Sequence, residues 1–109
     1  MAKPVILAVD DDPQVLAAVR RDLRERYAED YQILAAASGA EALESVVELH
    51  DAGRTVAAFL VDQRMPGMTG TEFLVQAQES FPEAKRLLLT AYADTEAAIQ
   101  AINDVGLDH

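Results

Sequence analysis

The sequence predicts an α/β fold in which helices cover both faces of a parallel sheet. Four short apolar runs alternate along the chain with segments that carry a helical apolar stripe, the order typical of such sheets. The runs Val5–Val9 and Val56–Val61 are continuous, as expected for strands buried on both faces. The 109 residues, half of them apolar, fit one domain over residues 1–109 with a core of its own.

The first strand, Val5–Val9, leads into a helix whose start and end are both marked. Asp12 supplies an N-cap and Pro13 a proline at the first helical position. Apolar side chains then recur at helical spacing, and the helix is expected to end near Tyr27. Residues 31–37 return to an apolar strand.

Two capping boxes mark the next two helices. Residues 38–41, Ser-Gly-Ala-Glu, open a second helix that residues 51–53, Asp-Ala-Gly, end. After the third strand, Val56–Val61, residues 69–72, Thr-Gly-Thr-Glu, open a third helix, which ends at residues 80–82.

The last strand and helix are predicted close to the end of the chain. Residues 85–90, with three consecutive leucines, form a fourth strand. Asp94 caps a final helix, and Gly106 ends it.

Polar side chains stand where three of these strands end. Asp10 and Asp11 follow the first strand, Asp62 follows the third, and Thr90 closes the fourth. The carboxyl ends of parallel strands meet at one edge of a sheet, and neighbouring strands are about 4.8 Å apart. These side chains can therefore meet. Because a pocket of like charge is unstable, the sequence predicts a cation or a positive reactive centre between the carboxylates.

The composition excludes several classes of function. Nine basic and nineteen acidic residues leave a net charge of -10, which disfavours nucleic acid and anionic membranes as direct partners. Without cysteine there is no disulfide, thiolate metal site or cysteine nucleophile. No apolar stretch is long enough for a signal peptide core or a membrane span, so we expect a cytoplasmic protein.

Basic residues are concentrated on the first helix. It carries four arginines, Arg20, Arg21, Arg24 and Arg26. We expect them to form a solvated face, with pairs between i and i+4 to acidic residues of the same helix.

Three motifs at the strand ends resemble the receiver domain of two-component response regulators. They are Asp10-Asp11, Asp62 with residues 65–70 (Met-Pro-Gly-Met-Thr-Gly), and Thr90-Ala91. The resemblance covers essentially the whole chain and implies a CheY-like, flavodoxin-like sheet of strand order 2-1-3-4. It also implies a phosphorelay in which a sensor histidine kinase phosphorylates the domain, which then switches an output domain or effector protein.

The resemblance further implies a role for each site residue. Asp62 would be the phosphoacceptor, and Mg²⁺ would be bound by Asp11, Asp62 and the backbone carbonyl of Arg64, with Asp10 acting through water. Thr90 would bind a phosphoryl oxygen through its hydroxyl and act as the switch. Such a domain is not an enzyme in the usual sense, because it takes part only in its own phosphorylation and dephosphorylation.

One departure from the family's pattern leaves an alternative open. Receivers carry a lysine before a proline at the end of a fifth strand, then a fifth helix, and this chain ends at residues 106–109, where that strand is expected to begin. The resemblance therefore implies a receiver truncated before its fifth strand. We expect homodimers through the exposed side of the fourth strand. The alternative is a receiver-like protein-interaction module that is not phosphorylated because the lysine is absent.

A phosphatase of the haloacid dehalogenase type is a weaker alternative. Asp10 and Asp12 have the Asp-x-Asp spacing of its nucleophile and acid. That family has Thr or Val two residues after the second Asp, where this chain has Gln14.

Overall fold

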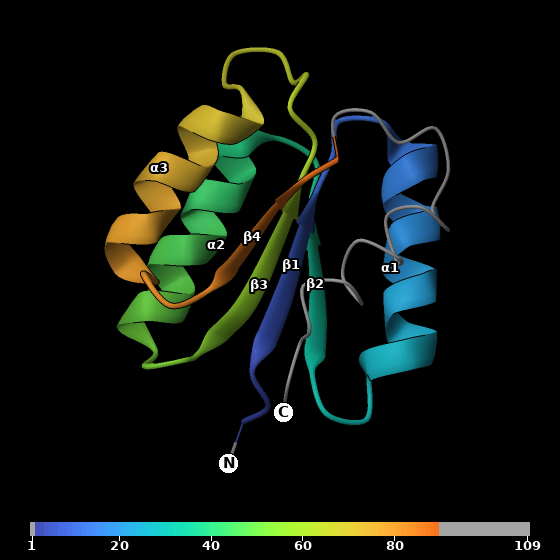
Figure 1. Ribbon diagram of the computed structural model, residues 1–109, viewed down its shortest axis with the longest axis vertical. Helices are drawn as coiled ribbons and strands as arrows, with labels where there is room; N and C mark the ends of the chain where they lie inside the picture. The colour runs from blue at the N-terminus through green and yellow to red at the C-terminus, as the bar shows by residue number, and fades with distance from the viewer. Residues whose placement is uncertain (1, 90–109) are drawn as a thin grey trace.

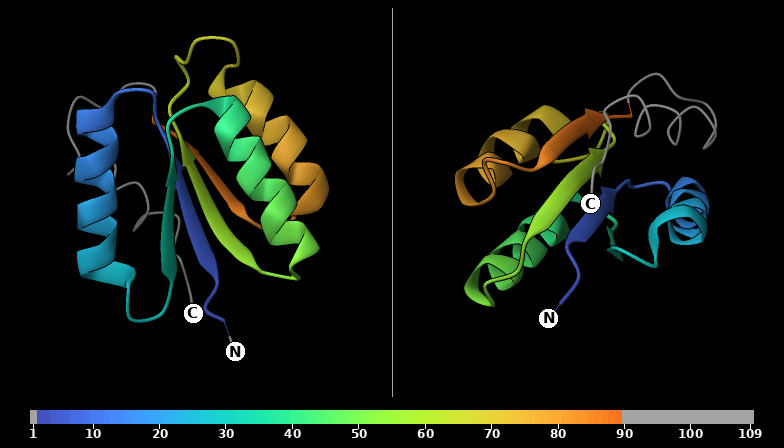
Figure 2. Two further views of the ribbon diagram at one scale, coloured as in Figure 1. Left: turned by 180° about the vertical axis from the view of Figure 1, so that it is seen from behind. Right: turned by 60° about the horizontal axis from the view of Figure 1, so that its bottom comes forward.

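The structure, a computed structural model, describes residues 2–89 as alternating strands and helices. The described elements are β1 (Val5–Val9), α1 (Pro13–Tyr27), β2 (Gln32–Ala36), α2 (Gly39–Asp51), β3 (Val56–Val61), α3 (Gly70–Ser80) and β4 (Lys85–Leu88). Figure 1 shows α2 and α3 side by side on one face of the sheet and α1 on the other, and the view from behind in Figure 2 agrees. Thr90 and the helix predicted after Asp94 lie outside the described residues.

All paired strands are parallel and follow the order β2-β1-β3-β4, so the predicted fold class and strand order are confirmed. The register aligns the strand ends: Val9 of β1 pairs with Val61 of β3. Two backbone hydrogen bonds extend these ladders, from Asp62 N–H to the Val9 carbonyl at 2.9 Å and from Leu89 N–H to the Val61 carbonyl at 2.8 Å. Residues that follow β1 and β3 therefore leave the sheet at the same level.

The helix caps predicted at Asp12, Ser38 and Thr69 are present, whereas the one predicted at Asp94 lies outside the described residues. Asp12 Oδ1 accepts a hydrogen bond from Gln14 N–H at 2.9 Å, and Ser38 Oγ accepts one from Glu41 N–H at 3.1 Å. At α3 the capping box is complete, because Thr69 and Glu72 each accept from the other's backbone N–H. Capping satisfies N–H groups that have no partner within the helix, which is why these short motifs locate the helix starts well.

The predicted second strand was one residue too long at each end. Tyr31 is buried, but its N–H donates to the Tyr27 carbonyl at 2.8 Å, so Tyr31 belongs to the turn after α1. β4 ends at Leu88, although Leu89 keeps a backbone bond to β3. Within residues 2–89, none of the helices combines the length and the apolar character of a membrane span.

Side chains of alternating direction along β1 and β3 build two apolar layers. The layer under α2 and α3 centres on Phe59 and Phe73, which are fully buried and meet edge to face with ring centroids 5.6 Å apart. The layer under α1 includes Ile6, Leu60 and Leu23. Both faces of β1 and β3 are covered, which explains their continuous apolar runs.

We expect Phe73→Ala to lower the free energy of unfolding by about 3 to 5 kcal/mol, because it leaves a cavity under α3 that the packed sheet cannot fill. Val75→Ala is the matched control in the same helix: Val75 is 61% exposed, and its loss should stay within about 0.5 kcal/mol. Urea unfolding of both variants measures the difference. Equal losses of unfolding free energy in the two variants would contradict the conclusion that Phe73 faces the core and Val75 faces solvent.

Self-association through the fourth strand stays a prediction. β4 is the outermost strand of the described sheet beyond β3, and Leu88 on it is 36% exposed. Light scattering at high protein concentration should give a dimer mass that Leu88→Lys lowers, because a charge on an edge strand opposes pairing with another chain. A monomer mass for the unmodified chain at every concentration would argue against the dimer.

Candidate metal site

The structure brings together the three carboxylates that the sequence places after β1 and β3. Asp10, Asp11 and Asp62 each offer a carboxylate oxygen, and these oxygens lie within 4.8 Å of one another. Asp10 is 6% exposed, Asp62 is half-buried and Asp11 is exposed. The cluster is thus buried on the Asp10 side and open to solvent on the Asp11 side.

Local hydrogen bonds give the three consecutive aspartates different roles. Asp10 Oδ1 accepts a hydrogen bond from Asp12 N–H at 2.8 Å, which fixes its side chain against the start of α1. Asp12 caps α1 through its own carboxylate. Asp11, between them, is exposed, so its carboxylate can turn toward a ligand.

The loop after Asp62 is tied to the first turn of α3 by Gln63. Its Oε1 accepts hydrogen bonds from the Thr71 N–H at 2.8 Å and from the Thr71 hydroxyl at 2.9 Å. Its carbonyl accepts from the N–H groups of Met65 and Gly70, both at 3.2 Å. Sequence reasoning missed this contact, although a polar residue directly after a buried strand and free N–H groups at a helix start were both visible.

Close packing around the loop depends on two glycines. A Cβ on Gly70 would lie 2.6 Å from the Asp62 carbonyl oxygen, so only glycine lets α3 begin this near to Asp62. A Cβ on Gly39 would lie 2.9 Å from the Met68 sulfur. Met65, 7% exposed, belongs to the core and Met68 packs against it, so these two methionines anchor the loop to the core.

The cluster is electrostatically strained without a cation. Burial raises the pKa of Asp10 above its ordinary value, and the charges of Asp62, Asp11 and Asp12 raise it further against the opposing hydrogen bond from Asp12 N–H. Burial also raises the pKa of Asp62, together with the charge of Asp11. Backbone N–H groups of Arg64 and Gln63 and the Arg64 charge lower the pKa of Asp62 but do not cancel the rise.

The donor set fits a hard divalent cation. All three donors are carboxylate oxygens, which Mg²⁺ and Ca²⁺ prefer. Oxygens that all lie within 4.8 Å of one another are close enough for one small cation to be held between them, directly or through a water. A bound cation would also remove the like-charge repulsion.

Two other predicted site residues stay predictions. Arg64 lies in the exposed part of the loop, two residues after Asp62, which places its carbonyl close along the chain without showing that it binds a metal. Thr90 lies outside the described residues.

Comparison with known proteins agrees with this arrangement. The profile of the family described as "Response regulator receiver domain" matches residues 6–109. The hydrogenase transcriptional regulatory protein HoxA of Cupriavidus necator is 35% identical over 102 residues, which are 94% of this chain and 19% of that protein. The chain therefore spans about a fifth of the length of this curated relative.

Two solved structures share the fold. A CheY-like receiver domain protein from Methanospirillum hungatei is 29% identical, with a TM-score of 0.68 over 94% of this chain and 75% of that one. A response regulator protein from Burkholderia pseudomallei, solved with a phosphorylated aspartic acid, calcium ion and citrate, is 25% identical. Its TM-score is 0.67, over 97% of this chain and 57% of that one.

We expect Asp10→Asn to raise the free energy of unfolding at pH 7 in the absence of divalent cations. Burial raises the pKa of Asp10 above the value of about 3.9 in the unfolded chain, so between these two values the folded state binds more protons. Stability of the unmodified chain therefore falls as pH rises through that window, whereas asparagine stays neutral. The gain in unfolding free energy from Asp10→Asn should vanish at pH values below the pKa of Asp10 in the unfolded chain.

Urea unfolding at a series of pH values measures this gain. Asp30→Asn, which removes an exposed carboxylate after α1, is the matched control and should change stability little. A gain from Asp10→Asn that grows as the pH falls would contradict the strained cluster.

Proposed function

The chain belongs to the response regulator receiver domain family, and on that premise we propose that it accepts a phosphoryl group at Asp62 in a two-component phosphorelay. The observation that carries the proposal is the convergence of Asp10, Asp11 and Asp62 at the carboxyl ends of β1 and β3. We assign the whole chain, residues 1–109, to this single domain. Its donor would be a sensor histidine kinase.

Asp62 acts as the nucleophile. One of its carboxylate oxygens forms a bond to phosphorus while the bond between phosphorus and the donor's histidine nitrogen breaks, and the released imidazole takes a proton from solvent. The product is an acyl phosphate on Asp62. Asp62 is half-buried, so the phosphoryl donor can reach its carboxylate from solvent. The hydrogen bonds of Gln63 hold the loop after Asp62 against α3 and so restrict the position of Asp62.

Asp10, Asp11 and Asp62 would hold the cofactor that this transfer needs, which we propose is Mg²⁺. When bound, the ion neutralises charge on the transferring phosphoryl oxygens. Asp11 and Asp62 would bind it directly, and Asp10, fixed by Asp12 N–H, would bind it through water. The carbonyl of Arg64 would complete the protein ligands, and we assign to the Thr90 hydroxyl the role of a donor to a phosphoryl oxygen and of the switch.

The similar proteins support both parts of this proposal. The Burkholderia pseudomallei response regulator contains a phosphorylated aspartic acid and a calcium ion in one structure. The HoxA relative is a transcriptional regulatory protein of which this chain matches a fifth. By analogy, phosphorylation here switches an output domain or an effector protein, and the domain, with its net charge of -10, leaves contact with nucleic acid to that partner. A cytoplasmic location follows from the same role.

We expect the chain to gain one phosphoryl group, or one bound beryllofluoride, when it is incubated with a small phosphodonor or with beryllofluoride and Mg²⁺. Intact mass spectrometry and a shift in melting temperature are the measurements. Asp62→Asn should abolish the modification. Asp11→Asn should reduce it strongly by weakening the metal site, because few carboxylates hold the ion.

The matched control is Asp12→Asn, which keeps an N-cap at α1 while removing a neighbouring charge, and it should remain modified. Modification that survives in Asp62→Asn would place the phosphoacceptor elsewhere. Absence of modification in the unmodified chain, and in a version extended through a fifth strand with its lysine, would favour the alternative of a receiver-like interaction module.

A further inference from the structure

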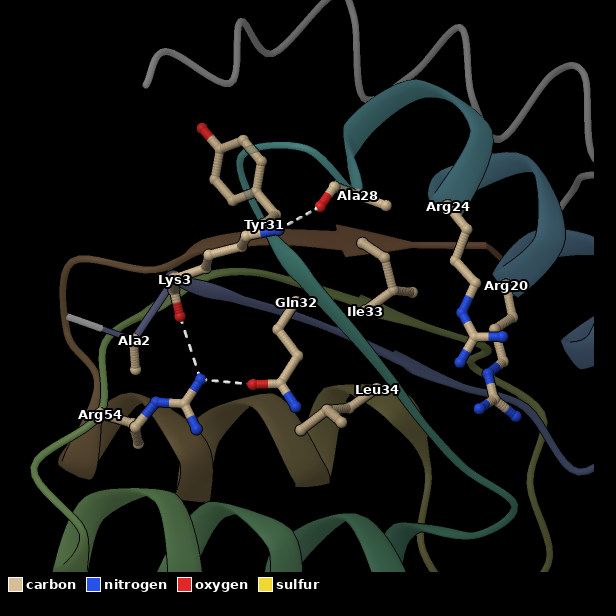
Figure 3. A pocket seen from close by; sticks show the side chains of 10 residues that line it. All are labelled: Ala2, Lys3, Arg20, Arg24, Ala28, Tyr31, Gln32, Ile33, Leu34 and Arg54. Atoms are coloured by element: carbon tan, nitrogen blue, oxygen red, sulfur yellow. Dashed lines mark hydrogen bonds between the residues drawn. The ribbon is translucent and has the colours of Figure 1, made fainter.

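A basic cavity lies along the outer strand β2, and its charge is opposite to that of the aspartate cluster. It has a volume of about 510 Å³ and is lined by four cationic side chains, Lys3, Arg20, Arg24 and Arg54. Figure 3 shows Arg20 and Arg24 extending from α1 on one side of β2, with Lys3 and Arg54 on the other side. Three separate segments of the chain therefore contribute to one basic cavity.

This concentration of charge is unexpected in so acidic a chain. The sequence has nine basic and nineteen acidic residues, yet four of the nine basic ones line this cavity and none of its described lining residues is acidic. Like charges around one cavity repel each other, and Arg20 and Arg24 are also neighbours at i and i+4 on α1, a spacing at which like charges destabilise a helix. An anionic ligand would convert this repulsion into attraction.

The arginines of α1 are available for a ligand. Arg20 and Arg24 are exposed, and the guanidinium group of neither forms an ion pair or a hydrogen bond with any residue in the described part of the chain. By contrast, Arg21 on the same helix pairs with Asp22 at 3.3 Å. The two unpaired arginines thus face the cavity, while their paired neighbour does not line it.

The other two cations are held in place by the backbone. Lys3 Nζ donates to the Ala28 carbonyl at 2.7 Å, beside the end of α1. Arg54 Nη2 donates to the Lys3 carbonyl at 3.0 Å and to the Gln32 side chain. Arg54 Nε is buried and has no hydrogen-bond partner among the described residues, so one donor of the cavity wall is unsatisfied.

The basic cavity is distant from the aspartate cluster. Lys3 precedes β1 and Arg54 precedes β3, whereas Asp10 and Asp62 follow these strands. The five residues of β1 span about 16 Å, so a ligand in the cavity would not contact the proposed phosphoacceptor.

We propose that this cavity binds a small organic phosphate with at least two negative charges. The cavity volume is within the range of about 300 to 1,000 Å³ that is typical of pockets for small molecules. An arginine guanidinium group can donate two parallel hydrogen bonds to two oxygens of one phosphate group. Ile33 and Leu34 add an apolar wall for the body of the ligand. A nucleic acid polymer fits less well, because the net charge of -10 repels it.

Titration of the uniformly ¹⁵N-labelled chain with pyrophosphate and with adenosine 5′-diphosphate, in buffer without divalent cations, tests the proposal. We expect saturable shifts in the amide signals of Arg24 and residues 31–34, with Asp62 and Gln63 little changed. Affinity should fall as salt is raised, because screening weakens contacts between exposed charges.

Two double variants separate a built site from general surface charge. Arg20→Gln with Arg24→Gln should weaken binding at least about tenfold, since each removes a charge-assisted hydrogen bond. Arg21→Gln with Arg26→Gln removes the same charge from the same helix outside the cavity and should change affinity by less than about twofold. Unperturbed spectra of both free variants would show that they fold alike.

Three results would overturn the proposal. One is the absence of saturable shifts with either phosphate. Another is an equal loss of affinity in the two double variants, which would mean diffuse attraction to α1. The third is tighter binding of an acidic peptide than of the diphosphate at the same amides, which would assign the cavity to a protein partner.

Discussion

The parallel register between β1 and β3 is the constraint on which the site depends. Val5 pairs with Val56, but an irregularity after this pair places Ile6 opposite Ala58, so that Val9 pairs with Val61. Without that shift, Val9 would face Leu60 and Asp62 would leave the sheet one residue later than Asp10. The covered faces of both strands enforce the register, because a slip by one residue would turn apolar side chains to the wrong layer.

The site opposes the stability of the fold that carries it. Burial and mutual repulsion raise the pKa of Asp10 and of Asp62, so the cluster favours protonation or a bound cation. The surrounding contacts hold it nonetheless: Asp12 N–H fixes Asp10, and Gln63 joins the loop to α3. Ionisable groups with shifted pKa values, held in place by the surrounding structure, are typical of functional sites. A bound cation would offset the repulsion between these carboxylates.

Much of the fold could be predicted because local signals and tertiary structure agree. Continuous apolar runs marked β1 and β3, and caps at Asp12 and Thr69 marked helix starts. The aspartate cluster could be predicted as well, because parallel strands bring their carboxyl ends together. Each of these inferences needs only the neighbouring sequence and one rule of topology.

Other features could not be predicted because they depend on distances between segments. The closeness of Gly70 to the Asp62 carbonyl and the bonds from Gln63 to Thr71 appear only once the loop is folded. The arginines of α1 are exposed as expected, but only the packing of α1 beside β2 brings two of them to a cavity with Lys3 and Arg54. A run of exposed arginines on a helix has the same sequence pattern whether the arginines are only solvated or bind a ligand.

Paramagnetic broadening by Mn²⁺, used at low concentration in place of Mg²⁺, tests most directly whether one cation occupies the shared cluster. The account predicts that amide signals of Asp10, Asp11 and Asp62 broaden first and together, that Mg²⁺ reverses the effect by competition, and that Asp11→Asn suppresses it. Broadening centred on other acidic residues, or on Asp62 without Asp10 and Asp11, would contradict the claim that the ends of β1 and β3 build one cation site.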